Sequence, residues 1–162
     1  MGTFALVFLA IAALFAVDMF LAKTEKAESQ VEAARLFEQG RGLMHRGENV
    51  EAIKRIKDAI SIERGNRDYL RTLAQVQFAA GKSADAESTL TELLQSDSTD
   101  GLTNLIMGRV MVKEDRFAEA LSYFHRAIYG HWNENAAENR LRVRFELIDL
   151  LAQRFRMMLL AI

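Results

Sequence analysis

The sequence predicts an all-α protein, in which an N-terminal transmembrane helix is followed by an α-solenoid of three helix–turn–helix units and a partial fourth unit. One observation is a pattern of small and large apolar positions that recurs every 34 residues. A second is a 19-residue apolar run, residues 4–22, that carries a single charge. The third is the absence of proline from all 162 residues, which favours a chain built of helices.

Each 34-residue period contains two small residues, one on each helix of a unit, and a large apolar residue one turn after the second. Small residues let two helix axes approach closely, and the large residue fills the space between units. The predicted packing positions are Gly40, Ala52, Ala74, Ala86, Gly108 and Ala120, and the large residues are Ile56, Leu90 and Phe124. Repetition of this kind predicts stacked helical hairpins.

A short break separates the two small positions of every unit. Gly47 and Gly81 can take the left-handed conformation that ends a helix, and Asn49, Ser83 or Asp115 can cap the helix that follows. Each period therefore reads as two helices of about a dozen residues joined by a tight turn.

The three units read ARLFEQGRGLMHRGENVEAIKRIKDAISIERGN from Ala34, RDYLRTLAQVQFAAGKSADAESTLTELLQSDSTD from Arg67, and GLTNLIMGRVMVKEDRFAEALSYFHRAIYGHWNE from Gly101. They resemble the tetratricopeptide repeat family over residues 33–132. The family's small–small–bulky–small signature falls on Gly40, Ala52, Ile56 and Ala59, and on Gly108, Ala120, Phe124 and Ala127. The middle copy ends on Leu93, and Arg64, Ser98 and Trp132 stand where the family often has proline.

The resemblance implies a docking surface for a protein partner, because the first helix of each unit in this family lines an inner groove. It places nine residues there: Phe37, Arg41, His45, Arg71, Gln75, Phe78, Leu105, Arg109 and Lys113. Guanidinium groups pair with carboxylates in fork geometry, so we expect an acidic or amphipathic peptide segment in the groove. The alternative is that these arginines are solvated and neutralised by Glu38 or Asp68. The family's carboxylate clamp uses Lys and Asn where this chain has Phe37, Arg41 and Thr72, which argues against chaperone-tail binding.

The apolar run FALVFLAIAALFAVDMFLA, residues 4–22, is about 28 Å long as a helix, which would just span a bilayer core. We therefore expect a single-pass membrane protein, of the bacterial inner membrane, with the side of the repeats left open by Lys23 and Lys26. A cleaved signal peptide is the alternative, although no basic residue precedes the run and the cleavage sites are poor. Asp18 lies near the end of the run, where a carboxylate reaches the headgroups at modest cost.

Four segments follow from these observations: an anchor over residues 1–22, a helical connector over 23–32, three repeat units over 33–135 and a partial fourth unit over 136–162. The connector lacks glycine and proline, so the anchor helix is expected to continue into the first repeat helix, the alternative being a flexible joint near Thr24 or Ser29. The fourth unit ends on the apolar residues 157–162, which indicates a truncated chain or an end that another chain or the membrane covers.

Composition and motifs exclude several classes of function. The net charge of −1 gives no basic excess for nucleic acid, and there is no cysteine. The three histidines are scattered without ligand spacing, and no phosphate loop or nucleophile motif is present. We therefore expect no enzyme activity, no cofactor, no metal and no small-molecule substrate. The expected function is a membrane-anchored protein–protein interaction scaffold; the alternatives are a structural subunit of a larger membrane complex and an accessory domain of an enzyme.

Overall fold

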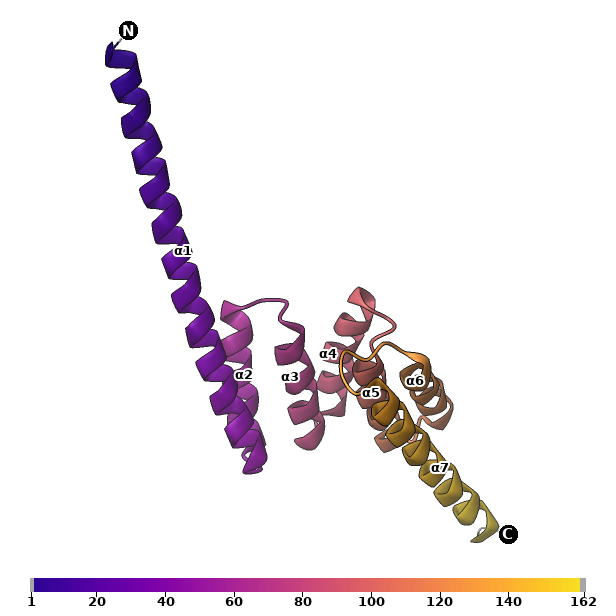
Figure 1. Cartoon of the computed structure of the whole chain (residues 1–162). Helices are drawn as coiled ribbons and strands as arrows, with labels where there is room; N and C mark the ends of the chain where they lie inside the picture. Colours follow the sequence, from indigo (N-terminus) through magenta and orange to yellow (C-terminus); the bar gives the residue numbers. More distant parts are fainter. Residues whose placement is uncertain (1, 161–162) are drawn as a thin grey trace.

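The computed structural model describes residues 2–160, with side chains described for Phe8 and from Ala13 onward. These residues form helices only, apart from turns and one isolated β-bridge. The helices are α1 (Gly2–His45), α2 (Asn49–Ile62), α3 (Arg67–Ala79), α4 (Ser83–Ser96), α5 (Gly101–Lys113), α6 (Phe117–Tyr129) and α7 (Ala136–Leu160). Figure 1 shows them stacked side by side in chain order, with the first part of α1 extending away from the array.

Consecutive helices pack against one another along the whole array, from α1 on α2 to α6 on α7. α1 also touches α3, and α3 touches α5, so the first helices of successive units lie beside each other. The predicted all-α helical repeat is therefore confirmed as a solenoid.

The small residues of the 34-residue period lie where the helices come closest. Ala52, Ala74, Ala86 and Ala120 are completely buried. A Cβ atom on Gly40 would meet Cγ1 of Ile56 at 2.6 Å, so α1 and α2 are in contact at this glycine. The large residues Ile56, Leu90 and Phe124 are buried as well, each on the second helix of its unit.

The turns within the units use a left-handed residue, as glycine permits: φ is 77° at Gly47 and 76° at Gly81. In the third unit Asp115 takes this place with φ of 54° and so ends α5 instead of capping α6. Asn49 and Ser83 do not cap either, because α2 and α4 begin at these residues and the preceding Glu48 and Lys82 make no side-chain cap.

Side-chain caps are found instead in the loops between units. Asn66 accepts hydrogen bonds from the backbone N–H groups of Asp68 and Tyr69 at the start of α3. Asp100 accepts one from Thr103 at the start of α5. These caps satisfy donors that the first helical turn leaves free, and they fix where the first helices of units two and three begin.

The described residues contradict the predicted transmembrane helix over residues 4–22. None of the helices, as far as the structure describes them, offers an apolar stretch that could cross a bilayer. The helix that contains this run, α1, carries Asp18 within the run and charged residues from Lys23 onward. The side chains of residues 1–7 and 9–12, on which the rest of that prediction falls, lie outside the described part. The predicted localisation as a single-pass membrane protein is withdrawn with the helix.

Two long helices frame the repeats. α1 is one continuous helix of 44 residues and passes Thr24 and Ser29 without a break. The hydroxyls of these two residues bond back to Leu21 and Glu25 within the helix. α7 continues as one helix for 25 residues. Residues 161–162 of the predicted fourth unit lie outside the described part.

Candidate functional site

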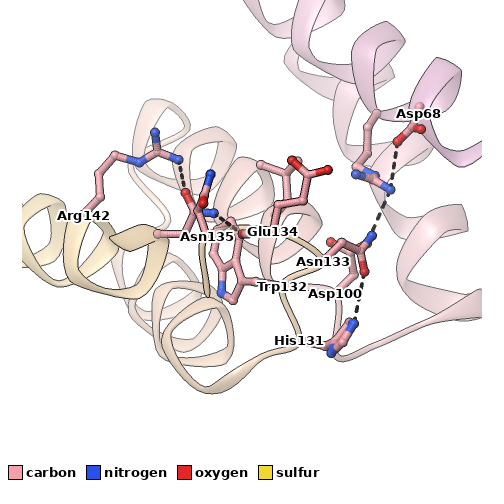
Figure 2. Close-up of a pocket in the computed structure, with 11 residues that line it drawn as sticks. Asp68, Asp100, His131, Trp132, Asn133, Glu134, Asn135 and Arg142 are labelled. Atoms are coloured by element: carbon pink, nitrogen blue, oxygen red, sulfur yellow. Dashed lines mark hydrogen bonds and ion pairs between the residues drawn. The ribbon is translucent and has the colours of Figure 1, made fainter. Parts of the chain in front are cut away.

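Two adjoining hollows lie along the first helices of the second, third and fourth units, on α3, α5 and α7. The first, the polar hollow, has a volume of about 380 Å³ and is formed by the N-terminal ends of these helices and the loop of residues 131–135 (Figure 2). The second, the apolar hollow, has a volume of about 540 Å³ and lies toward the C-terminal ends of α3 and α5. Arg142 of α7 lines both hollows and so marks their boundary.

The polar hollow is organised around the carboxylate of Asp100. This residue is 8% exposed, and its position follows from its role as the cap of α5. Its Oδ2 atom lies 3.3 Å from Nη2 of Arg67 and 3.8 Å from Nη2 of Arg71. Arg71 also pairs with Asp68 at 3.2 Å, and its side chain is 14% exposed. The charges at the α3 side of the polar hollow are therefore largely compensated within the chain.

A pair of backbone hydrogen bonds ties the loop of residues 131–135 to the start of α5. The N–H of Gly101 donates to the carbonyl of His131, and the N–H of His131 donates to the carbonyl of Thr99, both at 2.7 Å. The indole of Trp132 is buried against Gly101 and donates to the carbonyl of Ala127 at 2.9 Å. The loop is thus fixed on both sides, and it sets the position from which α7 begins.

The apolar hollow has a largely apolar lining that is crossed by one ion pair and also includes Asp149 and Gln153 of α7. Phe78, Val112, Phe145 and Leu150 supply apolar surface from α3, α5 and α7. Arg109 of α5 donates two hydrogen bonds to the carboxylate of Glu146 on α7, both 2.7 Å long. These hydrogen bonds raise the pKa of Arg109, against the opposing effect of burial. The bidentate pair fastens α7 to α5 within the hollow.

A family model described as a tetratricopeptide repeat-like domain matches residues 2–141, which is most of the chain. The chain belongs to this family. No curated protein matches it in sequence.

Solved structures of tetratricopeptide repeat (TPR) proteins share the fold. A type III secretion complex from Aeromonas hydrophila is similar to this chain with a TM-score of 0.68 and 17% identity, over 86% of this chain and 97% of that one. The first TPR domain of human RPAP3 has a TM-score of 0.61 and 21% identity, covering 78% and 98%. The second TPR of Spaghetti (RPAP3), bound to an HSP90 peptide, has a TM-score of 0.60 and 18% identity, covering 67% and 99%. At these identities the likeness concerns the fold alone.

Among the expected groove residues of this TPR chain, those on α1 lie apart from both hollows. The ring of Phe37 stacks on Tyr69 with centroids 4.3 Å apart, so it belongs to the contact between α1 and α3. Arg41 pairs with Glu38 at 2.9 Å. His45 is exposed at the end of α1. The first unit therefore contributes no wall to either hollow.

The expected residues of α3 and α5 divide between the hollows and the core. Arg71 lines the polar hollow, and Phe78 and Arg109 line the apolar one. Leu105 is buried in the core, and Gln75 is half-buried outside both linings. Nζ of Lys113 lies 4.9 Å from the ring centroid of Phe78, a cation–π contact at the edge of the apolar hollow.

The contribution of α7 and of the loop before it is not among the residues predicted from the sequence. Arg142, Phe145, Glu146 and the loop residues complete both hollows. One signal was available, because the 34-residue step from Leu105 leads to Asn139, which lines the polar hollow. The bidentate partner of Arg109 has no such signal, since Glu146 is 37 positions away and belongs to the next unit.

Among the described residues no group of three or more His, Asp or Glu side chains is placed to hold a metal ion. The polar hollow does contain His131, but its ring lies beside the amide oxygen of Asn133 at 3.0 Å. What the two hollows offer together is a continuous surface with apolar side chains at one end and paired charges at the other.

Proposed function

We propose that this chain is a protein-interaction scaffold that docks an amphipathic peptide segment of a partner protein across the two hollows on α3, α5 and α7. The observation that carries the proposal is the apolar hollow with a cationic residue at its boundary. The structure of a TPR domain of Spaghetti bound to an HSP90 peptide supports this type of use for the fold. The proposal concerns the surface alone and commits to no particular partner protein.

The apolar hollow favours a peptide with at least one large apolar side chain. Phe145 is 58% exposed and Val112 is 36% exposed, so both present apolar surface to solvent. Covering side chains of this size is worth roughly 1.5–3 kcal/mol for each one that becomes fully buried. A peptide that places an apolar side chain between them would remove both from water.

We expect Arg142 to bind the acidic group of the peptide. Its Nη2 atom donates to the amide oxygen of Asn139 at 2.9 Å, and within the described residues it makes no ion pair. Arg71 and Arg109, by contrast, already have carboxylate partners. A peptide carboxylate would therefore gain most from Arg142, which can offer a second fork of donors without breaking an existing pair.

The test begins with selection of binding peptides from a random display library on the full chain, followed by fluorescence anisotropy with the selected peptides. The site variant carries Val112→Glu and Arg142→Glu. The control variant carries Val50→Glu and Arg55→Glu, which make the same changes on the exposed side of α2, outside both hollows.

The proposal predicts that selected peptides combine apolar and acidic residues. It also predicts that the site variant binds them at least about tenfold more weakly, a change of about 1.4 kcal/mol, while the control variant retains full affinity. Equal affinity for the two variants would refute docking in the hollows. Selection of basic peptides would refute the role given to Arg142.

A further inference from the structure

α7 carries an apolar stripe with the spacing of a coiled coil. Its members recur in alternating steps of four and three residues: Leu141, Phe145, Ile148, Ala152, Phe155 and Leu159. We call this set the α7 seam. All six side chains are exposed in the structure. Apolar residues at such positions, a and d of a heptad, form the contact line when two helices wrap around each other. The seam extends over roughly 28 Å of helix.

The burial of α7 follows the same heptad from the other side. Val143 is buried, and Leu147 and Leu150 are partly buried against the core built by α5 and α6. Arg109 holds Glu146, and Asp115 at the end of α5 contacts Arg154. The α7 residues that contact the repeats occupy positions b, c and f of the heptad: Val143, Glu146, Leu147, Leu150 and Arg154. The face that packs on the repeats is therefore opposite the seam, and a second helix can approach the seam without displacing the array.

The charged residues beside the seam indicate which helix would pack against it. With Phe145 at position a, Arg144 occupies g and Asp149 occupies e. In a parallel pair of identical helices, the residue at position g of one chain faces the residue at position e of the other chain, five residues further along. Arg144 therefore meets Asp149 of the second copy, and this contact occurs on both sides of the pair. Both side chains are exposed, and among the described residues neither forms an ion pair within its own chain.

The antiparallel arrangement lacks this complementarity. Aligning the seam in that direction places Phe145 opposite Phe155, and it brings the two copies of Asp149 together and Arg142 next to Arg156. Like charges across a helix pair disfavour that alignment. We infer that two copies of this chain associate through the α7 seam as a parallel two-stranded coiled coil, with paired Arg144 and Asp149 side chains flanking it.

The first test measures, by sedimentation over a range of concentrations, the mass of the species that the full chain forms in solution. The expected species has twice the chain mass of 18.3 kDa. The seam variant carries Ile148→Glu and Phe155→Glu, which avoids Phe145 because that residue also lines the apolar hollow. The control is Leu160→Glu, which introduces the same charged side chain on the same helix at an 81% exposed position outside the seam.

The seam variant is expected to weaken the dimer at least about 100-fold, because each lost seam side chain counts in both copies. The control is expected to change the dissociation constant of the dimer by less than about threefold. Circular dichroism is used to check that the variants keep their helices. A monomer at every concentration would overturn the inference. So would a dimer that the seam variant leaves unchanged, which would assign association to another surface such as the exposed apolar side chains of α1.

The second test fixes the direction of the helices and uses the absence of cysteine from the chain. Ala152→Cys places a single thiol at a seam position that meets its own copy in the parallel pair and Ile148 in the antiparallel pair. Rapid oxidation to a cross-linked dimer is expected for Ala152→Cys and not for the neighbouring control Gln153→Cys. Equal cross-linking of both variants, or of neither, would overturn the parallel arrangement. Arg144→Glu is further expected to weaken the dimer, and adding Asp149→Arg to restore it.

Discussion

Three glycines in first helices provide a graded test of how closely the repeats are packed. Gly42 has room for a methyl group, since a Cβ atom there would make only an ordinary van der Waals contact, with Nη1 of Arg46 at 3.7 Å. Gly108 is tighter, with ring atoms of Phe124 at 3.2 and 3.3 Å. Gly40 is the tightest, with Cγ1 of Ile56 at 2.6 Å and backbone atoms of α2 at 3.3 Å. All three lie inside helices, so the conformational benefit of alanine is the same for each.

The balance of two effects sets the expected results for glycine-to-alanine changes at these positions. Alanine in a helix interior stabilises by about 0.5–1 kcal/mol relative to glycine. Overpacking a filled contact costs about 1–3 kcal/mol. Gly42→Ala should therefore stabilise by nearly 1 kcal/mol, and Gly108→Ala should be close to neutral, because the Phe124 ring must move by only a few tenths of an ångström. Gly40→Ala should destabilise by about 1–2 kcal/mol, since the buried Ile56 has no room to retreat.

The assay is thermal and urea unfolding of the full chain followed by circular dichroism. The unfolding temperatures of Gly42→Ala and Gly40→Ala should differ by about 5–10 °C, with Gly108→Ala between them. Gly42→Ala serves as the internal control for helix propensity. If Gly40→Ala stabilised the chain as much as Gly42→Ala does, the close approach of α1 to α2 at this glycine would be refuted.

Two further changes test the loops that position α7. Trp132→Phe removes the indole donor from the carbonyl of Ala127 and should lower the free energy of unfolding by about 1–3 kcal/mol, because a buried acceptor is left unpaired; an unchanged urea midpoint would contradict that role. Hydrogen bonds from the hydroxyl and the N–H of Thr99 lower the pKa of Asp97. The ionised carboxylate therefore stabilises the fold above its unfolded-state pKa, which is near 4. This stabilisation is lost as the pH falls through the lower pKa of the folded state. Asp97→Asn should therefore be less stable than the parent at pH 7 and should approach it in urea unfolding at about pH 3, whereas a constant difference between the two pH values would exclude the charge as the cause.

The helical repeat was predictable because it follows from local chemistry. The recurrence of small residues at Ala52, Ala86 and Ala120 requires only that helices pack closely, and glycine at 47 and 81 is enough to end a helix. The caps were harder to predict. Asn49 and Ser83 have the right chemistry, but they stand one position inside their helices, whereas Asn66 and Asp100 stand at the boundary.

The predicted transmembrane helix shows a different limit of sequence reasoning. The hydropathy of residues 4–22 predicts that the whole run forms one membrane-spanning unit. In the described part of the chain no helix is apolar enough to cross a membrane. The run instead begins the α1 helix, which continues through charged residues into the first repeat, as expected for a connector without glycine or proline.

The candidate site shows why a repeat position does not by itself give a free binding residue. The repeat resemblance identifies the helix face that carries Arg109, but whether its charge is available depends on the next unit, where Glu146 neutralises it. Arg142, which the repeat pattern did not single out, keeps its charge free of ion pairs in the described residues because it lies beside Asn139 rather than a carboxylate. α7 therefore determines which charges of the groove a partner can use. It lines the two hollows with Arg142 and contributes Phe145 both to the apolar hollow and to the seam, so a docked peptide and a second copy of the chain would meet at this residue of the fourth unit.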